Sequence, residues 1–558
     1  MTATVTDLGA AADRKTAAER RAELNLVELA AAAAEKEGVC RRPLPMLATT
    51  DDGGSKYIGA PCKSTLECVC PACAARARLL RIQQAHEGWH IGEEPVVEKK
   101  KPTEQQTSLL KARADLMSAY TDAKETGDTE MMAGIREVVD DLDAELRETG
   151  IRGKLPSLDP KEKPVRKRST RRQQAAPDLP RKKVGKTTIG REYAGKYRPS
   201  LFLTLTLPSY GRVGPDGAPV NMETYDYRQA ARDTIHFAAL FDRFIQNYRR
   251  ASGRDIQYFA TVEPQRRGAP HIHIGIRGTD PKELIRQLAA ATYHQVWWPH
   301  FNEPTYPDTL PFFDHQQQKF VDPDTREPVP TWDQVQDLMA SVDELEPAHV
   351  IRFGQQIDVK GILGGTEEAK RHIGYLTKYL TKSIGDVIEP KTHRQADHYD
   401  RLHQELCKTP CSPTCGIWFR YGVVPKGANA KTQPGMCKGK AHRRETLGLR
   451  GRRVLVSRKW TGKDLADHKA DRADFVRQRL AEAGMPQEQV ERMVITPVKP
   501  GDPNVPPREH LIMQMVAQKI SWRAEYTQAM LADPPDVSDM PVSRETAAPQ
   551  QDSSDTAA

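Results

Sequence analysis

The sequence lacks several features that would assign it to large classes of protein. No apolar run approaches the roughly 20 residues that are needed to cross a bilayer, and the N-terminus lacks the positive-then-apolar layout of a signal peptide. Val184-Gly-Lys-Thr-Thr has no upstream glycine and so does not complete a phosphate-binding loop. We therefore expect a cytoplasmic protein that does not contact a membrane and is not itself a helicase motor.

Composition and charge point to several folded parts and a polyanionic partner. The 558 residues are enough for two to four domains, at about 150 residues per domain. With 28% charged residues and 41 prolines, solvated segments should separate the folded parts. The formal net charge of +8 is unevenly distributed, which favours a partner such as nucleic acid.

Nine cysteines fall in two clusters, and in a cytosolic protein such clusters are more typical of metal ligands than of disulfides. In the first cluster a Cys-x-x-Cys pair precedes a basic segment, and tetrahedral zinc sites typically combine such a close pair with a more distant pair. The predicted ligands are Cys40, Cys62, Cys70 and Cys73, with Cys68 as the substitute. The alternatives are unpaired thiols or, less favoured because no βαβ pattern surrounds the pair, a redox dithiol.

The second cysteine cluster predicts another zinc module, so that up to two structural Zn²⁺ ions are expected. Its ligands would be Cys407, Cys411, Cys415 and Cys437, and His442 could replace one of them. Basic residues with interleaved aromatics follow, a pattern that suits contact with duplex or single-stranded DNA. The predicted DNA-binding residues are Arg443, Arg444, Arg452, Arg453, Arg458 and Lys459. The alternative is a basic surface around a structural zinc knuckle.

The stretch from Tyr258 to Arg277 predicts a β-hairpin that carries two histidines on one face. Alternation in the second strand places isoleucines toward a core and His271 and His273 on the opposite face, where Glu263 can also stand. Two imidazoles and a carboxylate on rigid strands can bind a divalent metal. Taken alone, a His-x-His pattern is more often a pair of surface histidines.

Other segments predict the elements around this hairpin. Residues 201–207 should form a strand with a threonine-lined face, residues 227–250 and 281–297 helices, and residues 300–348 an irregular insertion. A helix that includes Tyr375, Lys378, Tyr379 and Lys382 would place a phenol beside an ammonium group twice. A lysine favours the phenolate and can hold a phosphate, although tyrosine and leucine stripes are most often core packing.

Together these motifs resemble those of rolling-circle replication initiators in the HUH endonuclease superfamily, especially initiators of actinobacterial plasmids and integrative elements. The resemblance covers about residues 40–475, and its motifs occur in the family's order. They include Phe202-Leu-Thr-Leu-Thr206, Glu263-Pro-Gln-Arg-Arg, Ala269-Pro-His271-Ile-His273, His349-Val-Ile-Arg-Phe-Gly, Tyr375-Leu-Thr-Lys378-Tyr379-Leu-Thr-Lys382 and Val454-Leu-Val-Ser-Arg-Lys-Trp460.

The resemblance implies an α+β fold with a central antiparallel sheet, flanked by helices, that carries the His-x-His on a middle strand. It implies Mg²⁺ or Mn²⁺ bound by His271, His273 and Glu263, with Gln265 in reserve. Tyr379 or Tyr375, with a slight preference for Tyr379, would nick single-stranded origin DNA and form a 5′-phosphotyrosine with a free 3′-OH. The lysines of the same helix, Lys378 and Lys382, would steady the phosphate.

The predicted organisation places cysteine-rich modules at both ends of the endonuclease domain. The units are a 1–36 Ala-rich tail, a 37–92 zinc module, a 93–190 charged helical and basic linker, a 191–390 HUH domain, a 400–475 zinc and DNA-contacting module, and a 476–558 helix and disordered tail, with the Pro-rich end from Pro497 mostly disordered.

Origin DNA, a host helicase and a host polymerase are the implied partners. A transposase or relaxase with the same chemistry, or a non-catalytic zinc-stabilised DNA-binding regulator, are the alternatives. The tyrosines follow the histidines in the chain, whereas in relaxases they precede them, which favours an initiator.

Overall fold

The protein is described here from a computed structural model of the whole chain. The residues it describes are 25–49, 54–96, 102–151, 155–159, 179–190, 192, 198–342, 344–363, 366–378, 388–449, 453–482, 494–498 and 501–531. Helices and antiparallel sheets are mixed throughout this part of the chain, so the predicted α+β class is confirmed. None of the described helices is both long enough and apolar enough to cross a lipid bilayer.

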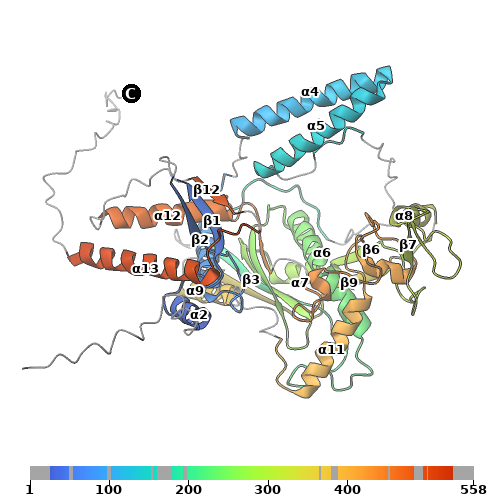
Figure 1. Ribbon diagram of the computed structural model, residues 1–558. Helices are drawn as coiled ribbons and strands as arrows, with labels where there is room; N and C mark the ends of the chain where they lie inside the picture. Colours follow the sequence, from blue (N-terminus) through green and yellow to red (C-terminus); the bar gives the residue numbers. More distant parts are fainter. Residues whose placement is uncertain are drawn as a thin grey trace, which may run out of the picture.

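A five-stranded antiparallel sheet lies at the centre of the molecule (Figure 1). Its strand order is β10-β3-β5-β4-β11. The strands are β3 (Pro199–Thr206), β4 (Tyr258–Pro264), β5 (Pro270–Arg277), β10 (Ile357–Leu363) and β11 (Val454–Val456). The predicted hairpin is β4–β5, and its second strand lies in the middle of the sheet.

One face of this sheet builds the main hydrophobic core. Alternation along β3 and β5 directs leucines and isoleucines to this face, where they pack against α6 (Tyr227–Ser252). Asp226 caps the start of α6, and Gly253 ends it in the left-handed conformation. The core residues from the strands are Leu201, Leu203, Leu205, Ala260, Val262, Ile272, Ile274 and Ile276.

The opposite face of the sheet is covered by α3 (Pro71–His90) and α9 (Glu367–Thr377). Phe202 and Phe259 point to this side and pack in a second core with Trp89, Ile373 and Trp460. The histidines of β5 share this face, because they alternate with its core isoleucines. A helix from the N-terminal cysteine region therefore packs directly on the sheet.

The segment after the hairpin differs in part from the sequence expectation. The predicted helix 281–297 ends early: α7 spans Lys282–Ala291, and β6 (Tyr293–Val296) then pairs with β9 (His349–Arg352). The Thr292 hydroxyl donates to the Leu288 carbonyl at the end of α7, and the β-prone residues that follow continue as a strand. The insertion predicted to be irregular contains β7 (Phe312–Asp314), β8 (Lys319–Val321) and α8 (Trp332–Ser341).

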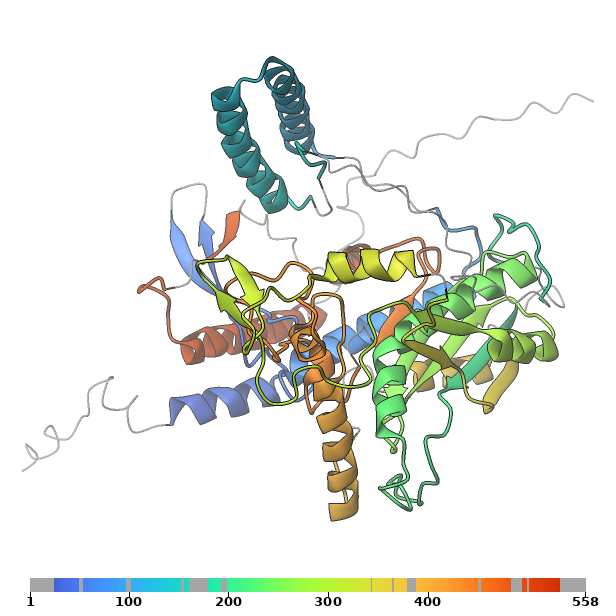
Figure 2. The ribbon, with the colours of Figure 1, turned by 90° about the vertical axis from the view of Figure 1, so that its right-hand side faces the viewer.

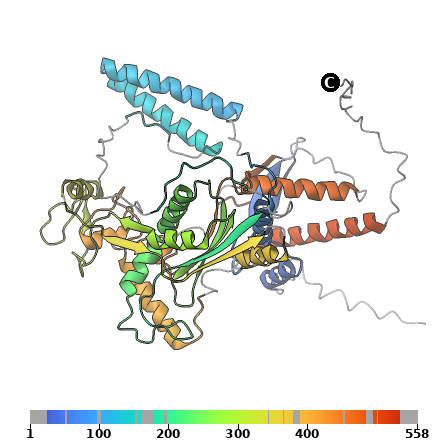
Figure 3. The same ribbon diagram turned by 180° about the vertical axis from the view of Figure 1, so that it is seen from behind.

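The two ends of the described chain fold together. Strands β1 (Leu44–Thr49) and β2 (Ser55–Ala60) form a sheet with β12 (Val494–Pro497), and α2 (Leu26–Lys36) packs on α13 (Arg508–Leu531). Figure 3 shows the blue N-terminal strands beside the orange and red helices α12 (Leu465–Glu482) and α13. The expectation that the chain beyond Pro497 is mostly disordered is wrong for α13, which buries apolar side chains against α2.

A helical hairpin lies between the N-terminal module and the central sheet in sequence. Helices α4 (Glu104–Thr126) and α5 (Thr129–Glu148) form a pair in the segment that was predicted to be a charged helical linker, and Figure 2 shows them projecting from the rest of the molecule. Most of the basic run predicted for the following linker, and the ends of the chain, lie outside the described residues. The remaining helix, α11 (His393–Lys408), packs beside α6.

The packing of α3 on the sheet gives a direct test of the fold. A Cβ atom on Gly275 would lie 2.2 Å from the ring of Trp89, which is 2% exposed. We expect Gly275→Ala to lower the free energy of unfolding by about 1–3 kcal/mol through overpacking. The measurement is the urea midpoint followed by tryptophan fluorescence.

Gly361 provides the matched control, because it lies in β10 of the same sheet and a Cβ there has nothing within 4 Å. Gly361→Ala should be neutral or stabilising by up to about 1 kcal/mol. Equal destabilisation by the two substitutions would show that α3 does not pack on β5 as described.

Candidate metal centre and cysteine clusters

The register of the hairpin brings Glu263, His271 and His273 together. Glu263 on β4 stands opposite His271 on β5, and His273 lies two residues further along the same face. Their ligand atoms lie within 4.8 Å of one another. The turn that connects the strands contains Gly268 at a positive φ of 76°, which the sequence Arg267-Gly-Ala-Pro supplies.

A hydrogen bond from the neighbouring strand orients one of the imidazoles. Nδ1 of His273 lies 2.9 Å from Oγ1 of Thr204, which faces it on β3. The other ring nitrogen, Nε2, lies 2.9 Å from Nε2 of His271. A bond that holds one ring nitrogen directs the other toward a metal, as in many metal centres. The threonine-lined face of β3 was the sequence signal for this partner.

Glu263 and His273 are buried and His271 is half-buried, and burial shifts the pKa of each toward its neutral form. Burial raises the pKa of Glu263 to about 7, and lowers the pKa of His271 to about 4 and that of His273 to about 3. Glu263 is 4% exposed. Within the described part of the chain, Oε1 of Glu263 and Nδ1 of His271 have no hydrogen-bond partner.

This donor set fits a divalent cation. A buried carboxyl without a full set of hydrogen bonds is costly when charged, and a cation removes that cost by favouring the carboxylate and the neutral imidazoles. Two histidines and one carboxylate are a recurring ligand set for divalent metals. Oε1 of the reserve ligand, Gln265, accepts a hydrogen bond from Nε of Arg267 at 2.7 Å in the turn.

Helix α9 places Tyr375 at the edge of this centre. The Thr261 hydroxyl on β4 donates to the Leu376 carbonyl at 2.8 Å, which fixes the end of the helix against the sheet. The ring of Tyr375 lies edge-on to His273, with 4.9 Å between ring centroids, and its side chain is 42% exposed. Tyr379 and Lys382 lie outside the described residues.

The positive charges of two residues act on the carboxyl group of Glu263. Burial raises its pKa, while the positive charges of Arg453 and Lys378 act in the opposite direction. Lys378 directly follows the last residue of α9, whereas the sequence predicted it inside the helix. Arg453 comes from the segment that was predicted to contact duplex or single-stranded DNA. No pattern in the sequence indicates that β11 joins the central sheet, so this position of Arg453 is not predictable from it.

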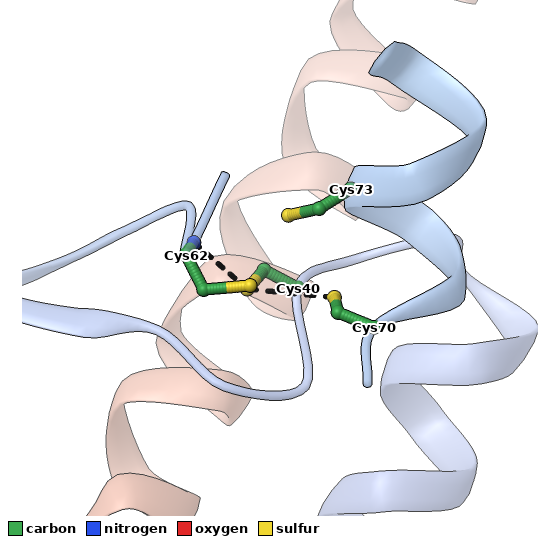
Figure 4. Close-up of side chains that lie close together, drawn as sticks. All are labelled: Cys40, Cys62, Cys70 and Cys73. Carbon is green, nitrogen blue, oxygen red and sulfur yellow. Dashed lines mark hydrogen bonds between the residues drawn. The ribbon is translucent and has the colours of Figure 1, made fainter. Parts of the chain in front are cut away.

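The N-terminal cysteine cluster contains the four preferred residues. Cys40 follows α2, Cys62 follows β2, and Cys70 and Cys73 lie at the start of α3 (Figure 4). Their sulfur atoms lie within 4.8 Å of one another, and the two sulfurs of Cys40 and Cys70 are 3.8 Å apart. The substitute, Cys68, is exposed and is not among the four.

The helix start favours the thiolate form of one ligand in this cluster. Burial opposes ionisation of Cys70, but the backbone N–H groups of Cys73 and Arg41 and nearby thiols outweigh it and lower its pKa to about 7. The geometry is that of a Cys-x-x-Cys knuckle at a helix N-terminus. The cluster could hold a structural metal such as zinc.

The C-terminal cluster consists of Cys411, Cys415, Cys437 and His442, again with ligand atoms within 4.8 Å. Nδ1 of His442 donates to the Leu406 carbonyl at 2.9 Å, and Nε2 lies 3.5 Å from Sγ of Cys415. The backbone therefore orients this imidazole toward the thiols. Three cysteines and one histidine are a common zinc ligand set, so this cluster could also hold a structural metal.

Cys407 is not in the group with the other three predicted cysteine ligands. His442 takes the place that the predicted four-cysteine set gave to Cys407. Cys407 lies in the last turn of α11, and its sulfur is 3.5 Å from Nε2 of His403, one turn earlier. The same sulfur lies 3.9 Å from the carbonyl oxygen of His442. The helix therefore directs Cys407 alongside the cluster rather than into it.

The predicted DNA-binding residues do not share one environment. Arg444 and Lys459 form ion pairs with Asp400 and Asp255 at 2.6 and 3.1 Å. Arg443 and Arg458 are exposed, and Arg453 lies opposite Val262, immediately before β11. Arg452 lies outside the described residues.

The two cysteine clusters predict a zinc content that can be measured. Protein purified without chelators should contain two Zn²⁺ per chain by mass spectrometry of the elements. Cys73→Ser and Cys411→Ser should each remove one ion, because a tetrahedral structural site needs all four ligands.

Each cluster has its own control cysteine. Cys68→Ser and Cys407→Ser should keep both ions, because these thiols lie outside the two ligand groups. Loss of one ion in Cys407→Ser together with full retention in His442→Ala would show that Cys407 is the ligand after all.

Comparison with known proteins agrees with the replication motifs. The family model described as "Replication initiator protein, pSAM2" matches residues 27–518, which is most of the chain. Neither the curated proteins nor the solved structures contain a significant match to this sequence. The matched span includes the central sheet, the metal centre and both cysteine clusters. The chain therefore belongs to the RepSA family of replication initiator proteins.

Proposed function

We propose that the protein starts replication by nicking one strand of origin DNA through a tyrosine transesterification of the HUH type. The observation that carries this proposal is the convergence of Glu263, His271 and His273 on a sheet face beside the exposed Tyr375. A phenol beside a divalent-metal ligand set can act as a nucleophile on a phosphate whose charge the metal stabilises. The pSAM2 initiator family supplies the biological context.

The reaction exchanges one phosphodiester for another. The tyrosine phenol loses its proton, its oxygen forms a bond to the scissile phosphorus, and the bond from phosphorus to the 3′-oxygen breaks. The 3′-oxygen takes up a proton and leaves as a hydroxyl that can serve as a primer. Because the phosphotyrosine conserves the energy of the broken bond, the reverse reaction can rejoin DNA ends.

Each residue of the centre has a definite task in this scheme. Glu263, His271 and His273 would hold Mg²⁺ or Mn²⁺, whose chemistry is charge stabilisation at a phosphate oxygen. Thr204 keeps the His273 ring in the orientation that this binding requires. Lys378, immediately after α9, would steady the phosphate near the tyrosine.

Two tyrosines four residues apart would allow one attack to begin a round of replication and the other to end it. Tyr375 is supported by its position beside His273. Tyr379 is proposed from its place in the repeated Tyr-Leu-Thr-Lys motif, in which Lys382 repeats the role of Lys378.

The outer parts of the chain would recognise the origin. We propose that the two cysteine clusters bind structural Zn²⁺ and that exposed basic residues around the C-terminal cluster, such as Arg443 and Arg458, contact phosphates. Unwinding and synthesis would then come from a host helicase and polymerase in the cytoplasm. A transposase or relaxase would use the same chemistry. A non-catalytic zinc-stabilised regulator would use the DNA-binding parts alone. The match to a replication initiator family favours the nicking initiator over these two alternatives.

Covalent capture of DNA tests the chemistry. With labelled single-stranded origin DNA and Mn²⁺, the protein should form a covalent adduct that persists in Tyr375→Phe and Tyr379→Phe singly and disappears in the double variant. Glu263→Ala should abolish the adduct while duplex binding, measured by mobility shift, stays within about threefold, since the basic region is intact.

Three outcomes contradict the proposal. Specific binding with no adduct would leave the regulator as the function. An adduct that survives in the double variant would place the nucleophile elsewhere. Adduct formation by Glu263→Ala at the wild-type rate would remove Glu263 from the centre.

The raised pKa of Glu263 gives a second, independent test in protein freed of Mg²⁺ and Mn²⁺. Its folded pKa of about 7 lies above the ordinary value of 4.5, so the native state keeps a proton that the unfolded chain has released. The stability that depends on this neutral carboxyl is complete below pH 4.5 and is lost as pH rises through 7. Glu263→Gln stays neutral at every pH.

The expected result is a difference in unfolding free energy that grows with pH. Relative to wild type, Glu263→Gln should gain stability between pH 5 and pH 8, by at most about 3 kcal/mol. Addition of Mn²⁺ should reverse the difference, because it stabilises the wild-type carboxylate. A difference that is constant with pH and unaffected by Mn²⁺ would show that Glu263 is not a buried ligand.

A further inference from the structure

Two threonines flank His273 on the face of the central sheet that carries the metal ligands. Thr204 on β3 and Thr261 on β4 are both paired with His273 in the antiparallel register. Residues paired across neighbouring strands point to the same face of a sheet, so these three side chains form one row. Thr204 bonds to the His273 ring, whereas Thr261, which is 0% exposed, donates its hydroxyl to the Leu376 carbonyl of α9 at 2.8 Å.

The bond from Thr261 reaches α9 beside the proposed nucleophile. Leu376 directly follows Tyr375, and α9 ends one residue later, at Thr377. The last four carbonyl groups of an α-helix have no partner within the helix, and the sheet supplies the partner for this one. The bond therefore joins the peptide unit next to Tyr375 to the residue that stands beside His273.

Apolar packing alone does not fix the position of Tyr375 as closely. Side chains of α9, among them Ile373 and Leu376, pack on Phe202 and Phe259 of the sheet. The hydrophobic effect is non-directional, so this contact holds the helix on the sheet but resists small sliding or rotation only weakly. A hydrogen bond depends on both distance and angle. The bond from the sheet therefore sets how far along its axis the helix lies.

We propose that Thr261 is a positioning residue that sets the distance between the Tyr375 phenol and the metal held by His273. This inference rests on the proposed nicking activity and deepens it. The Tyr375 ring lies edge-on to His273, with 4.9 Å between ring centroids, so a small movement of α9 changes this contact. A misplacement of about 1 Å can slow a reaction by about 10²-fold.

The two threonines thus have different tasks on either side of one imidazole. Thr204 orients the His273 ring, so its loss should weaken metal binding. Thr261 holds α9, so its loss should leave metal binding intact and disturb only the approach of the tyrosine. A hydroxyl that serves the stability of the fold alone would not separate these two effects.

The kinetic test uses a Tyr379→Phe background, in which Tyr375 is the remaining tyrosine of the pair. Adduct formation is followed under single-turnover conditions with saturating single-stranded origin DNA and Mn²⁺. Thr261→Val should lower the saturated rate by about 10–10²-fold, while the half-saturating concentrations of DNA and Mn²⁺ change by less than about threefold. Thr261→Ser keeps the hydroxyl and should restore most of the rate. Thr261→Ala gives the same comparison if valine prevents folding.

The same region offers two matched controls. Thr377 is also buried, but its hydroxyl donates to the Ile373 carbonyl at 2.8 Å within α9. Thr377→Val therefore removes a buried hydroxyl without cutting the link to the sheet, and its rate should stay within about threefold of the background. Thr204→Val should instead raise the half-saturating Mn²⁺ concentration by about 10–10²-fold, a defect that more Mn²⁺ corrects.

A second measurement needs neither DNA nor nicking. A fluorotyrosine in place of Tyr375 reports its distance from Mn²⁺, because a paramagnetic ion broadens nearby fluorine resonances and the broadening falls steeply with distance. Bound Mn²⁺ should broaden this resonance in the otherwise unchanged protein and in Thr377→Val. The broadening should differ in Thr261→Val, with Mn²⁺ affinity and circular dichroism unchanged.

The proposal is overturned if Thr261→Val slows the reaction no more than Thr377→Val does. It is also overturned if higher Mn²⁺ corrects Thr261→Val as it corrects Thr204→Val, or if the fluorine resonance in Thr261→Val is broadened as in the unchanged protein. Absence of an adduct with wild-type protein would instead overturn the proposed function, and the fluorine measurement would still decide whether Thr261 positions Tyr375.

Discussion

The antiparallel register of β3, β5 and β4 is the constraint on which the rest of the structure depends. It places two imidazoles and one carboxyl group on the same face of a sheet whose other face is packed with leucine and isoleucine. A shift of one residue would turn every side chain to the opposite face. The isoleucines of β5 therefore determine where its histidines point.

The surrounding elements hold this polar centre in an otherwise apolar environment. Thr204 orients His273, Thr261 holds the end of α9, and α9 brings Tyr375 to the ring of His273. Helix α3 closes the same face, with Trp89 against Gly275. The cysteine clusters organise the parts of the chain that lead to α3 and to β11. Both outer modules thus contribute to the walls of the centre.

Local patterns made much of this arrangement predictable. Period-two alternation gave the faces of β3 and β5, turn chemistry gave the hairpin, and the spacing of cysteines gave both clusters. These features depend on neighbouring residues in the chain. The helix pair α4–α5 and helix α6 were predictable for the same reason, because their apolar periodicity is local.

The features that were missed depend on residues far apart in the sequence. No local pattern shows that β11 pairs with β4, so the place of Arg453 at the start of β11 is not predictable from the sequence. In the same way β12 and α13 are stabilised by β1 and α2 from the other end of the chain. His442 rather than Cys407 completes its cluster because the fold of α11 turns Cys407 toward His403. Local helical periodicity and cysteine spacing do not indicate which distant segments pack together or which residue completes a ligand group.

The most direct test of the account is to locate the divalent ion in a crystal. The crystal would contain the Tyr375→Phe, Tyr379→Phe double variant, a single-stranded origin oligonucleotide and Mn²⁺. The account predicts an anomalous Mn²⁺ peak within bonding distance of Nε2 of His271, Nε2 of His273 and a carboxylate oxygen of Glu263. A phosphate oxygen of the DNA should bind the same ion. A Mn²⁺ peak at another place, or none on these three residues while DNA is bound, would contradict the central claim that this hairpin forms the catalytic metal centre.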